Sequence, residues 1–192
     1  MSQNIEIEFK NMLTLDEYSR IKSTFLLKEE QFFIQENHYF DTPAFSLKDK
    51  ESALRIRKKG NRFEMTLKQP ASIGLLETNQ EVTEREANDA IASGKLPAGE
   101  ISSLIEALEI SYSELEYFGT LTTKRAEFPY ENGLMVLDYS TYFHKEDYEL
   151  EYEVNDYETG KNTFAIFLKK FDIPERKTEN KIRRFFGQKY KG

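Results

Sequence analysis

Apolar and polar residues alternate along many short segments of the chain, which is the pattern of β-strands with one covered face. In Ile5–Lys10, three apolar side chains alternate with Glu6, Glu8 and Lys10. We expect the apolar faces, Ile5 included, to pack against helices or other apolar side chains. The pattern predicts eight strands: Ile5–Lys10, Phe33–Phe40, Ala53–Lys58, Arg62–Gln69, Leu75–Thr83, Leu115–Phe128, Leu134–Phe143 and Tyr148–Val154.

Helical signals lie between and after these strands. Thr14 stands three residues before Glu17, the spacing of a capping box, and predicts a helix from about Leu15 to Leu27. Phe164, Phe167 and Phe171 form an apolar stripe that is typical of core packing. Further helices are predicted at Glu84–Ser93, which Gly94 ends, at Ile101–Leu108, at about Asn162–Phe171 and at about Glu179–Lys189.

Short turns join several of the predicted strands, notably at Gly60-Asn61 and at Glu131-Asn132-Gly133. Tight turns imply antiparallel neighbours, and eight antiparallel strands are enough to close a small barrel. The sequence therefore predicts an α+β fold, an eight-stranded antiparallel barrel flanked by helices, in a single domain over residues 1–192.

Composition excludes several classes of protein. The 192 residues contain no cysteine, so disulfides, thiolate nucleophiles and cysteine-bound zinc are excluded. The first ten residues carry acidic side chains instead of an apolar signal segment, and no apolar run is long enough to span a membrane. We therefore expect a cytoplasmic protein with no membrane partner. The net charge of −7 also disfavours nucleic acid as a partner.

On the polar faces of several predicted strands, neighbouring positions carry the same sign of charge, and the sign differs from strand to strand. Glu149, Glu151 and Glu153 follow one another at every second position, as do Arg55 and Arg57. Residues two apart on a strand point the same way, so paired carboxylates can converge on Mg²⁺ or Mn²⁺, and paired arginines can bind adjacent anionic groups. The pattern alone leaves an alternative open, because a solvated sheet with cross-strand ion pairs also sorts charge by strand.

Seven segments resemble, in order, the motifs of the CYTH family, also called triphosphate tunnel metalloenzymes. The first is Glu6-Ile7-Glu8-Phe9-Lys10, which resembles the family's E-x-E-x-K signature. The others are Tyr39-Phe40-Asp41-Thr42-Pro43, Leu54-Arg55-Ile56-Arg57, Thr66-Leu67-Lys68, Lys124-Arg125, Leu137-Asp138 and Tyr148-Glu149-Leu150-Glu151-Tyr152-Glu153. The resemblance implies a tunnel with a charged interior that binds a triphosphate group and a divalent metal, Mg²⁺ or Mn²⁺.

The resemblance also implies roles for individual residues. The metal side would comprise Glu6, Glu8, Asp138, Glu151 and Glu153, with Glu149 ranked below them. The phosphates would be bound by Lys10, Arg55, Arg57, Lys68, Arg125 and a lysine near the C-terminus. For that lysine, Lys181 is the closest match and Lys177 is a rival. Lys10 and Glu8 are the candidates for proton transfer, and Glu64, Glu77, Glu81 and Arg85 are further candidates for the tunnel lining.

The activity that this resemblance favours is metal-dependent hydrolysis of a small triphosphate-containing molecule, foremost inorganic triphosphate. Three alternatives stay open: a thiamine triphosphatase, a class IV adenylate cyclase, and a non-catalytic binder of polyphosphate or nucleotide. His38 and His144 have no metal-ligand partner at helical spacing and are expected to be structural. The basic run Lys181, Arg183 and Arg184 has acidic surroundings, which argues against an RNA-binding patch.

Overall fold

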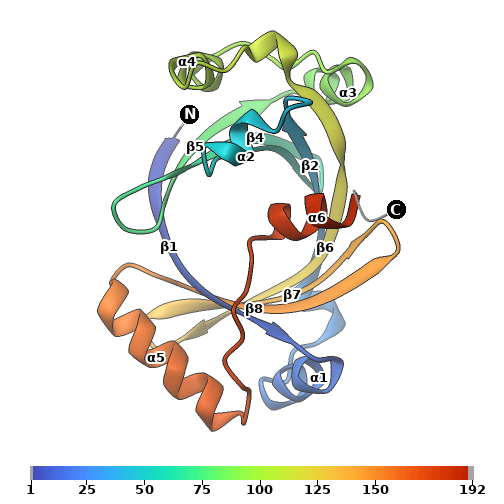
Figure 1. Cartoon of the computed structure of the whole chain (residues 1–192). Helices are drawn as coiled ribbons and strands as arrows, with labels where there is room; N and C mark the ends of the chain where they lie inside the picture. The colour runs from blue at the N-terminus through green and yellow to red at the C-terminus, as the bar shows by residue number, and fades with distance from the viewer. Residues whose placement is uncertain (1, 190–192) are drawn as a thin grey trace. The chain divides into compact units, whose positions relative to one another are not determined.

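The computed structural model describes residues 2–189 and contains the eight predicted strands. They are hydrogen-bonded in the order β1-β5-β4-β3-β2-β6-β7-β8 as a closed barrel (Figure 1). The pairs β1–β8, β2–β3, β3–β4, β4–β5, β6–β7 and β7–β8 are antiparallel. The predicted fold class is therefore confirmed. The strands are β1 (Ser2–Leu13), β2 (Phe32–Asp41), β3 (Ala53–Lys59), β4 (Arg62–Pro70), β5 (Leu75–Val82), β6 (Glu116–Tyr130), β7 (Gly133–Tyr142) and β8 (Lys145–Val154).

Helices lie where the sequence predicts them, with one short addition. They are α1 (Leu15–Thr24), α2 (Ser46–Asp49), α3 (Glu84–Ser93), α4 (Glu100–Ala107), α5 (Tyr157–Lys170) and α6 (Lys181–Lys189), with the short 3₁₀ turns η1 (Glu29–Gln31) and η2 (Tyr112–Glu114). The capping box at α1 is confirmed, because Thr14 and Glu17 exchange backbone–side-chain hydrogen bonds of 2.7 and 3.2 Å. Gly94 ends α3 at a φ of +70°, which is the left-handed conformation that glycine adopts most easily.

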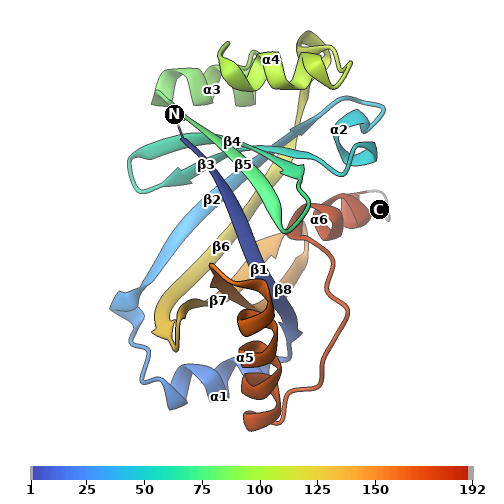
Figure 2. The ribbon, with the colours of Figure 1, turned by 90° about the vertical axis from the view of Figure 1, so that its left-hand side faces the viewer.

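The residues fall into two compact groups, each with its own core. The first comprises residues 2–5 and 35–121. Here Leu54, Ile56, Met65 and Leu67 are fully buried, in one cluster with apolar side chains of α3 and α4. Figure 2 shows these two helices along one face of β4 and β5. The charged side chains of β3 and β4 alternate with this apolar set, so packing against the helices fixes which face they occupy.

The second group comprises residues 6–34 and 122–189. Leu150 and Tyr152 of β8 are buried in a cluster with Phe164 and Phe167 of α5, and α1 contributes Ile21 to the same core. The predicted phenylalanine stripe is therefore core, as expected. Because Leu150 and Tyr152 point into this core, the acidic residues that alternate with them, Glu149, Glu151 and Glu153, are held on the opposite face of β8.

Three details differ from the sequence prediction. Ile5 was expected to be covered but is 52% exposed, whereas Phe9 on the same face of β1 contacts the rings of Tyr157 and Phe164. Helix α5 begins earlier than predicted, where the Asp156 side chain accepts the amide hydrogen of Thr159. The short α2 was missed because four residues carry no periodic signal.

Asp41 accounts for the position of α2. Its carboxylate accepts hydrogen bonds from the backbone amides of Thr42, Leu47 and Lys48, at 2.8 to 3.1 Å. The aspartate of the Tyr39–Pro43 motif thus stabilises the backbone after β2. Within the part of the chain that the structure describes, no helix is long and apolar enough to cross a membrane.

Candidate active site

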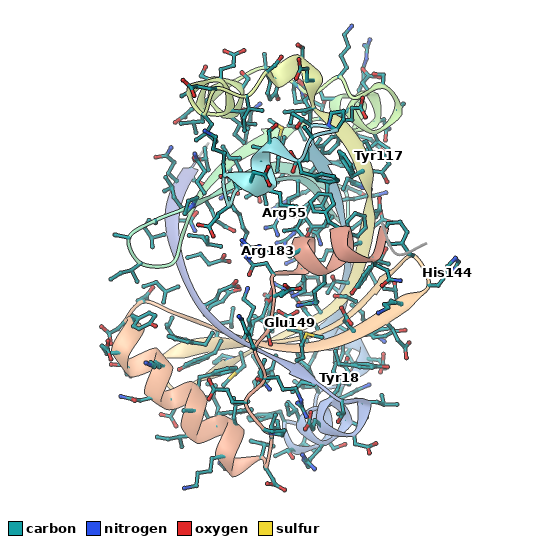
Figure 3. The ribbon with its side chains drawn as sticks, in the orientation of Figure 1. Tyr18, Arg55, Tyr117, His144, Glu149 and Arg183 are labelled. Carbon is teal, nitrogen blue, oxygen red and sulfur yellow. The ribbon has the colours of Figure 1, made fainter. Side chains whose placement is uncertain are left out.

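Charged side chains gather in two clusters, one in each group of residues. The cluster of the second group is built on β7 and β8, where Asp138, Glu149 and Glu151 are 0%, 1% and 5% exposed. Figure 3 marks Glu149 on β8. Side chains on a solvated sheet face would not be buried to this extent, so the solvated-sheet alternative is wrong for these residues.

Arg125 on β6 lies directly opposite Asp138 on β7 and binds it with two hydrogen bonds, of 2.8 and 2.6 Å. A further 2.7 Å hydrogen bond joins the same guanidinium to Glu151. Burial by itself would lower the pKa of Arg125, but Asp138 and Glu151 hold it well above its ordinary value. Two predicted acidic residues and one predicted basic residue thus form one buried ion-pair network.

Lys181, at the start of α6, adds a second cation to this network. Its Nζ lies 2.8 Å from Asp138 Oδ2 and 3.3 Å from Glu149 Oε2, and it donates to Glu151 Oε1. Burial opposes the positive charge, but the three carboxylates raise the pKa of Lys181 above its ordinary value. Lys177 is exposed. The contacts therefore favour Lys181 over Lys177 as the lysine of this cluster.

Two members of the cluster were missed at the sequence level. Arg184 on α6 binds both Asp147 and Glu149, with 3.0 Å from its Nε to Asp147 Oδ2. Asp147 was overlooked because the predicted strand began at Tyr148, whereas β8 begins at Lys145. Extending the alternating pattern toward the N-terminal end of the strand would have identified Asp147. Arg184 stands three residues after Lys181, a spacing that places both on one helical face.

Residues of β1 complete the cluster. Glu8 pairs in register with Glu153, and Lys10 with Glu151. Glu8 and Lys10 also form an ion pair with each other. The pKa of Glu153 is raised to about 7, first by burial and then by the nearby charge of Glu6, with smaller contributions from Glu151 and Glu8. Crowded carboxylates of this kind repel one another until a cation neutralises them.

These donors suit a hard divalent cation. All are carboxylate oxygens, the ligands that Mg²⁺ and Mn²⁺ prefer. As placed between residues 2 and 189, no three histidine, aspartate or glutamate side chains converge as a ready-made metal site. The predicted ligands Asp138 and Glu151 are instead paired with Arg125 and Lys181.

The second cluster lies in the first group of residues and carries an excess of positive charge. Lys68 and Arg55 both face Glu77, at 2.6 and 3.9 Å, and Figure 3 marks Arg55. Arg57 donates from its Nε to Asn37 Oδ1 at 2.8 Å. Burial by itself would raise the pKa of Glu77, but Lys68 and Arg55 lower it. The Nε of Arg55 is buried without a hydrogen-bond partner, so it is available to an anion.

Four further sequence candidates have different outcomes. Glu77 belongs to the basic cluster, as described. Glu64 is half-buried opposite both Arg57 and Glu81, whereas Glu81 is exposed. The prediction for Arg85 is wrong, because its side chain is 91% exposed on the solvent face of α3. The two histidines belong to neither cluster: His38 is hydrogen-bonded to Thr120 at 2.6 Å, and His144 is exposed.

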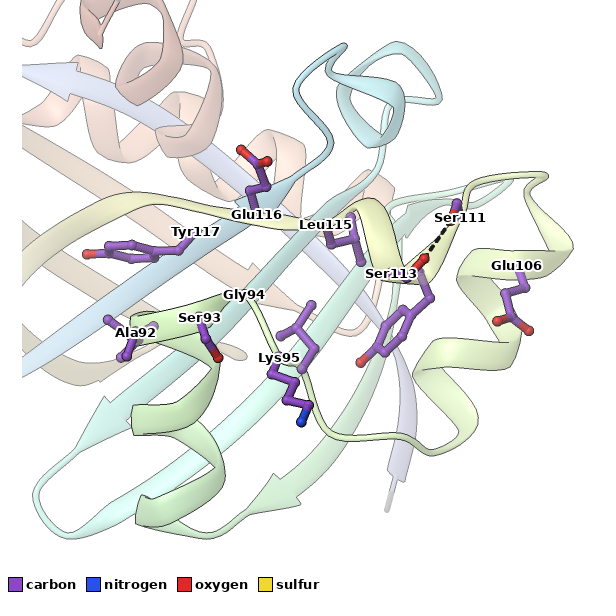
Figure 4. A pocket seen from close by; sticks show the side chains of 13 residues that line it. Ala92, Ser93, Gly94, Lys95, Glu106, Ser111, Ser113, Leu115, Glu116 and Tyr117 are labelled. Atoms are coloured by element: carbon purple, nitrogen blue, oxygen red, sulfur yellow. Dashed lines mark hydrogen bonds between the residues drawn. The ribbon is translucent and has the colours of Figure 1, made fainter.

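A pocket of about 800 Å³ lies apart from the basic cluster, between the end of α3, the turn η2 and the start of β6 (Figure 4). Its charged lining residues are Lys95, Glu106 and Glu116, which carry both signs. One cation against two carboxylates does not suit a polyanion, so the charged clusters remain the candidate site.

Comparison with known proteins identifies the family. The sequence model of the CYTH domain matches residues 4–186. The chain belongs to the CYTH domain family. It is 49% identical, over 100% of its length and 99% of the relative's, to a Bacillus subtilis protein named "Putative triphosphatase YjbK". Membership of this family confirms the resemblance inferred from the seven motifs.

Solved structures of other proteins show the same fold. A Bacillus halodurans protein described as "a putative adenylate cyclase" is 46% identical, with a TM-score of 0.93 over 97% of this chain and 100% of its own. The Hippeastrum protein HpAC1, described as having a dominant triphosphatase activity, is 24% identical, with a TM-score of 0.79 over 96% of both chains.

Proposed function

We propose that the protein is a divalent-metal-dependent triphosphatase, which cleaves inorganic triphosphate into diphosphate and phosphate. One observation carries the proposal: two sets of like charge are both retained although they are largely removed from water, a half-buried cationic set on β3 and β4 and an anionic set on β1 and β8 that includes the buried Glu149 and Glu151. A polyanion and a cation are the ligands that these sets would bind. The triphosphatase name of the Bacillus subtilis relative supports the same reaction.

In this proposal the basic residues bind and orient the phosphates. Arg55, Arg57 and Lys68 supply forked or point-charge donors, and Arg55 has a free Nε for a phosphate oxygen. Arg125 and Lys181 would add positive charge next to the carboxylates. Because these donors are held by ion pairs before substrate arrives, they neutralise the charge that develops as the phosphate anhydride breaks.

The carboxylates hold the metal and handle protons. Glu6, Glu8, Glu151 and Glu153, with Asp138 beside them, would be its ligands; when bound, Mg²⁺ or Mn²⁺ neutralises phosphate oxygens as a Lewis acid. Water is the nucleophile, and no cysteine competes for that role. Glu8 and Lys10, which form an ion pair, would accept and carry the proton that the attacking water loses.

Product analysis tests the proposal. The chain is incubated with inorganic triphosphate, thiamine triphosphate and ATP, each with Mg²⁺, with Mn²⁺ or with a chelator. We expect metal-dependent release of phosphate, fastest from inorganic triphosphate. Cyclic AMP with pyrophosphate would identify a cyclase, which is how the Bacillus halodurans relative is described. Binding without any product would identify a non-catalytic protein.

A matched pair of variants ties the activity to this site. Glu8→Gln keeps the shape of the side chain but removes a carboxylate charge, so turnover should fall more than tenfold, a loss above about 1.4 kcal/mol of transition-state stabilisation. Glu30→Gln makes the same change at an exposed position and should not alter turnover. Equal turnover in both variants would contradict the assignment of Glu8.

A further inference from the structure

Four carboxylates follow one face of β8 at every second position, and we call Asp147, Glu149, Glu151 and Glu153 the acid row. Successive members are about 6.8 Å apart at their Cα atoms. A divalent cation therefore has more than one place along the row where two carboxylates could hold it. Something must decide which end of the row it occupies.

Cationic partners are distributed unevenly along the acid row. At the end near the β7–β8 turn, Arg184 bridges the first two members, with its Nε 3.0 Å from Asp147 Oδ2 and its Nη2 donating to Glu149 Oε2. Tyr142 donates a further hydrogen bond of 2.5 Å to Asp147 Oδ2. The Arg184 side chain is only 12% exposed, so solvent screens these ion pairs weakly.

At the other end of the acid row the carboxylates have fewer cations beside them. Glu153 stands in register with Glu8 on the neighbouring strand, and Lys10 of that strand pairs with Glu8, so two opposed carboxylates share one adjacent lysine. Directly opposed carboxylates on antiparallel strands have Cβ atoms about 5 Å apart, which is within reach of one bound cation.

Arg184 is held in place by packing that does not depend on the carboxylates. The next residue, Phe185, is fully buried and stacks on Phe143 with 4.9 Å between ring centres. The segment before α6 is fastened to β1, since buried Asn11 accepts from the Arg176 amide at 2.6 Å and donates to the Pro174 carbonyl at 3.1 Å. The position of α6 therefore fixes Arg184 beside Asp147 and Glu149.

Glu149 shows that this end of the row has an unused capacity to bind. It is 1% exposed, and its Oε1 has no hydrogen-bond partner while Arg184 and Lys181 occupy Oε2. A buried carboxylate oxygen without a partner is costly, and it is a ready ligand for a cation if the neighbouring positive charge is removed.

We propose that Arg184 is a positioning residue that occupies Asp147 and Glu149 and thereby confines the divalent cation to the Glu8–Glu153 end of the acid row. The inference rests on the proposed function, because it concerns the metal which that function requires. Without Arg184, the Asp147–Glu149 end becomes a second cation site, where metal would be held away from the ligands proposed above.

The test counts bound Mn²⁺ in the full chain, stripped of metal and free of substrate, by the electron paramagnetic resonance signal of the unbound ion. Arg184→Gln removes the charge and should bind one more Mn²⁺ than the unaltered chain. Arg184→Lys keeps the charge and should bind the original number. Glu149→Gln added to Arg184→Gln should remove the extra ion. Arg20→Gln, the same change at an exposed position of α1, should leave the number unchanged.

Asp147→Asn in the otherwise unaltered chain supplies a second, independent measurement that does not require the loss of Arg184. We expect the number and affinity of bound Mn²⁺ to be unchanged, because Arg184 already excludes the ion from Asp147. A reduced number would overturn the inference, and so would an Arg184→Gln variant that folds and binds no additional Mn²⁺.

The same titrations separate this inference from the proposed function. If the unaltered chain binds Mn²⁺ but releases no phosphate from triphosphate, the proposed function is wrong, whereas the extra ion of Arg184→Gln would still support the role of Arg184. If the unaltered chain binds Mn²⁺ and hydrolyses triphosphate but Arg184→Gln binds no more, only the role assigned to Arg184 is wrong.

Discussion

Replacing Arg125 with methionine removes the guanidinium while keeping most of the apolar volume of its stem. Arg125 is 7% exposed and makes three hydrogen bonds, two to Asp138 and one to Glu151. Removing one partner of a buried ion pair costs about 3–5 kcal/mol, because the other charge stays buried. Lys181 still contacts both carboxylates, so we expect a loss of about 3 kcal/mol, the low end of that range.

The assay is thermal unfolding with a chelator present, followed by circular dichroism. For a chain of this length, 1 kcal/mol shifts Tm by about 2–4 °C, so Arg125→Met should melt about 6–12 °C lower than the unaltered protein. Arg20→Met, at an exposed position on α1, should change the free energy of unfolding by less than about 0.5 kcal/mol.

Lowering the pH should reduce the difference in stability between Arg125→Met and the unaltered protein. Lys181 and Arg125 lower the pKa of Glu151 against the opposing effect of burial, so its ion pairs stabilise the fold above the unfolded pKa of about 4.3. That stability is lost as the pH falls through the lower folded value. A loss under 1 kcal/mol at neutral pH, or a difference that grows in acid, would refute the reasoning.

Two further perturbations test the structure around the site. In Gly160→Ala, the new Cβ would lie 2.5 Å from Val154 Cγ2 and 2.9 Å from Phe9 Cε2, so α5 must shift away from β8. We expect urea unfolding to show a net loss of stability of about 1–2 kcal/mol. A gain in stability would contradict this packing. Glu17→Gln removes the ion pair to Arg176 that lowers the pKa of Glu17, so the variant should be less stable than the unaltered chain near neutral pH. This difference in stability should fade below about pH 4.3, where unfolded glutamate is protonated. An equal difference in stability at both pH values would refute the reasoning.

Most of the fold follows from local patterns that the sequence displays. Alternation located all eight strands, and capping at Thr14 and glycine at position 94 located two helix ends. What the pattern missed lacks periodicity: a four-residue helix fixed by the distant carboxylate of Asp41 leaves no signal in its own residues. Ile5 was misplaced because alternation shows which face a side chain occupies but not whether another element covers that face.

For the candidate site, the sequence located the charged residues but not how they pair. Alternation placed Glu149, Glu151 and Glu153 on one face, and the family motif identified Arg125 and Asp138. Their mutual hydrogen bonds depend on strand register, which joins positions thirteen residues apart. Arg184 depends on where α6 docks, and no local spacing reports a contact with a residue 37 positions earlier.

The two faces of β8 also determine where the chain can change length during evolution. One face carries the acid row and the other carries Leu150 and Tyr152 into the core with α5, so a single inserted or deleted residue within the strand would exchange the two. The carboxylates of the acid row would then point at the phenylalanine rings of the core. Leu150 and Tyr152 would point toward the ion-pair network. Insertions should therefore accumulate at exposed turns such as the one at His144, and β8 should keep its length wherever the protein keeps its fold.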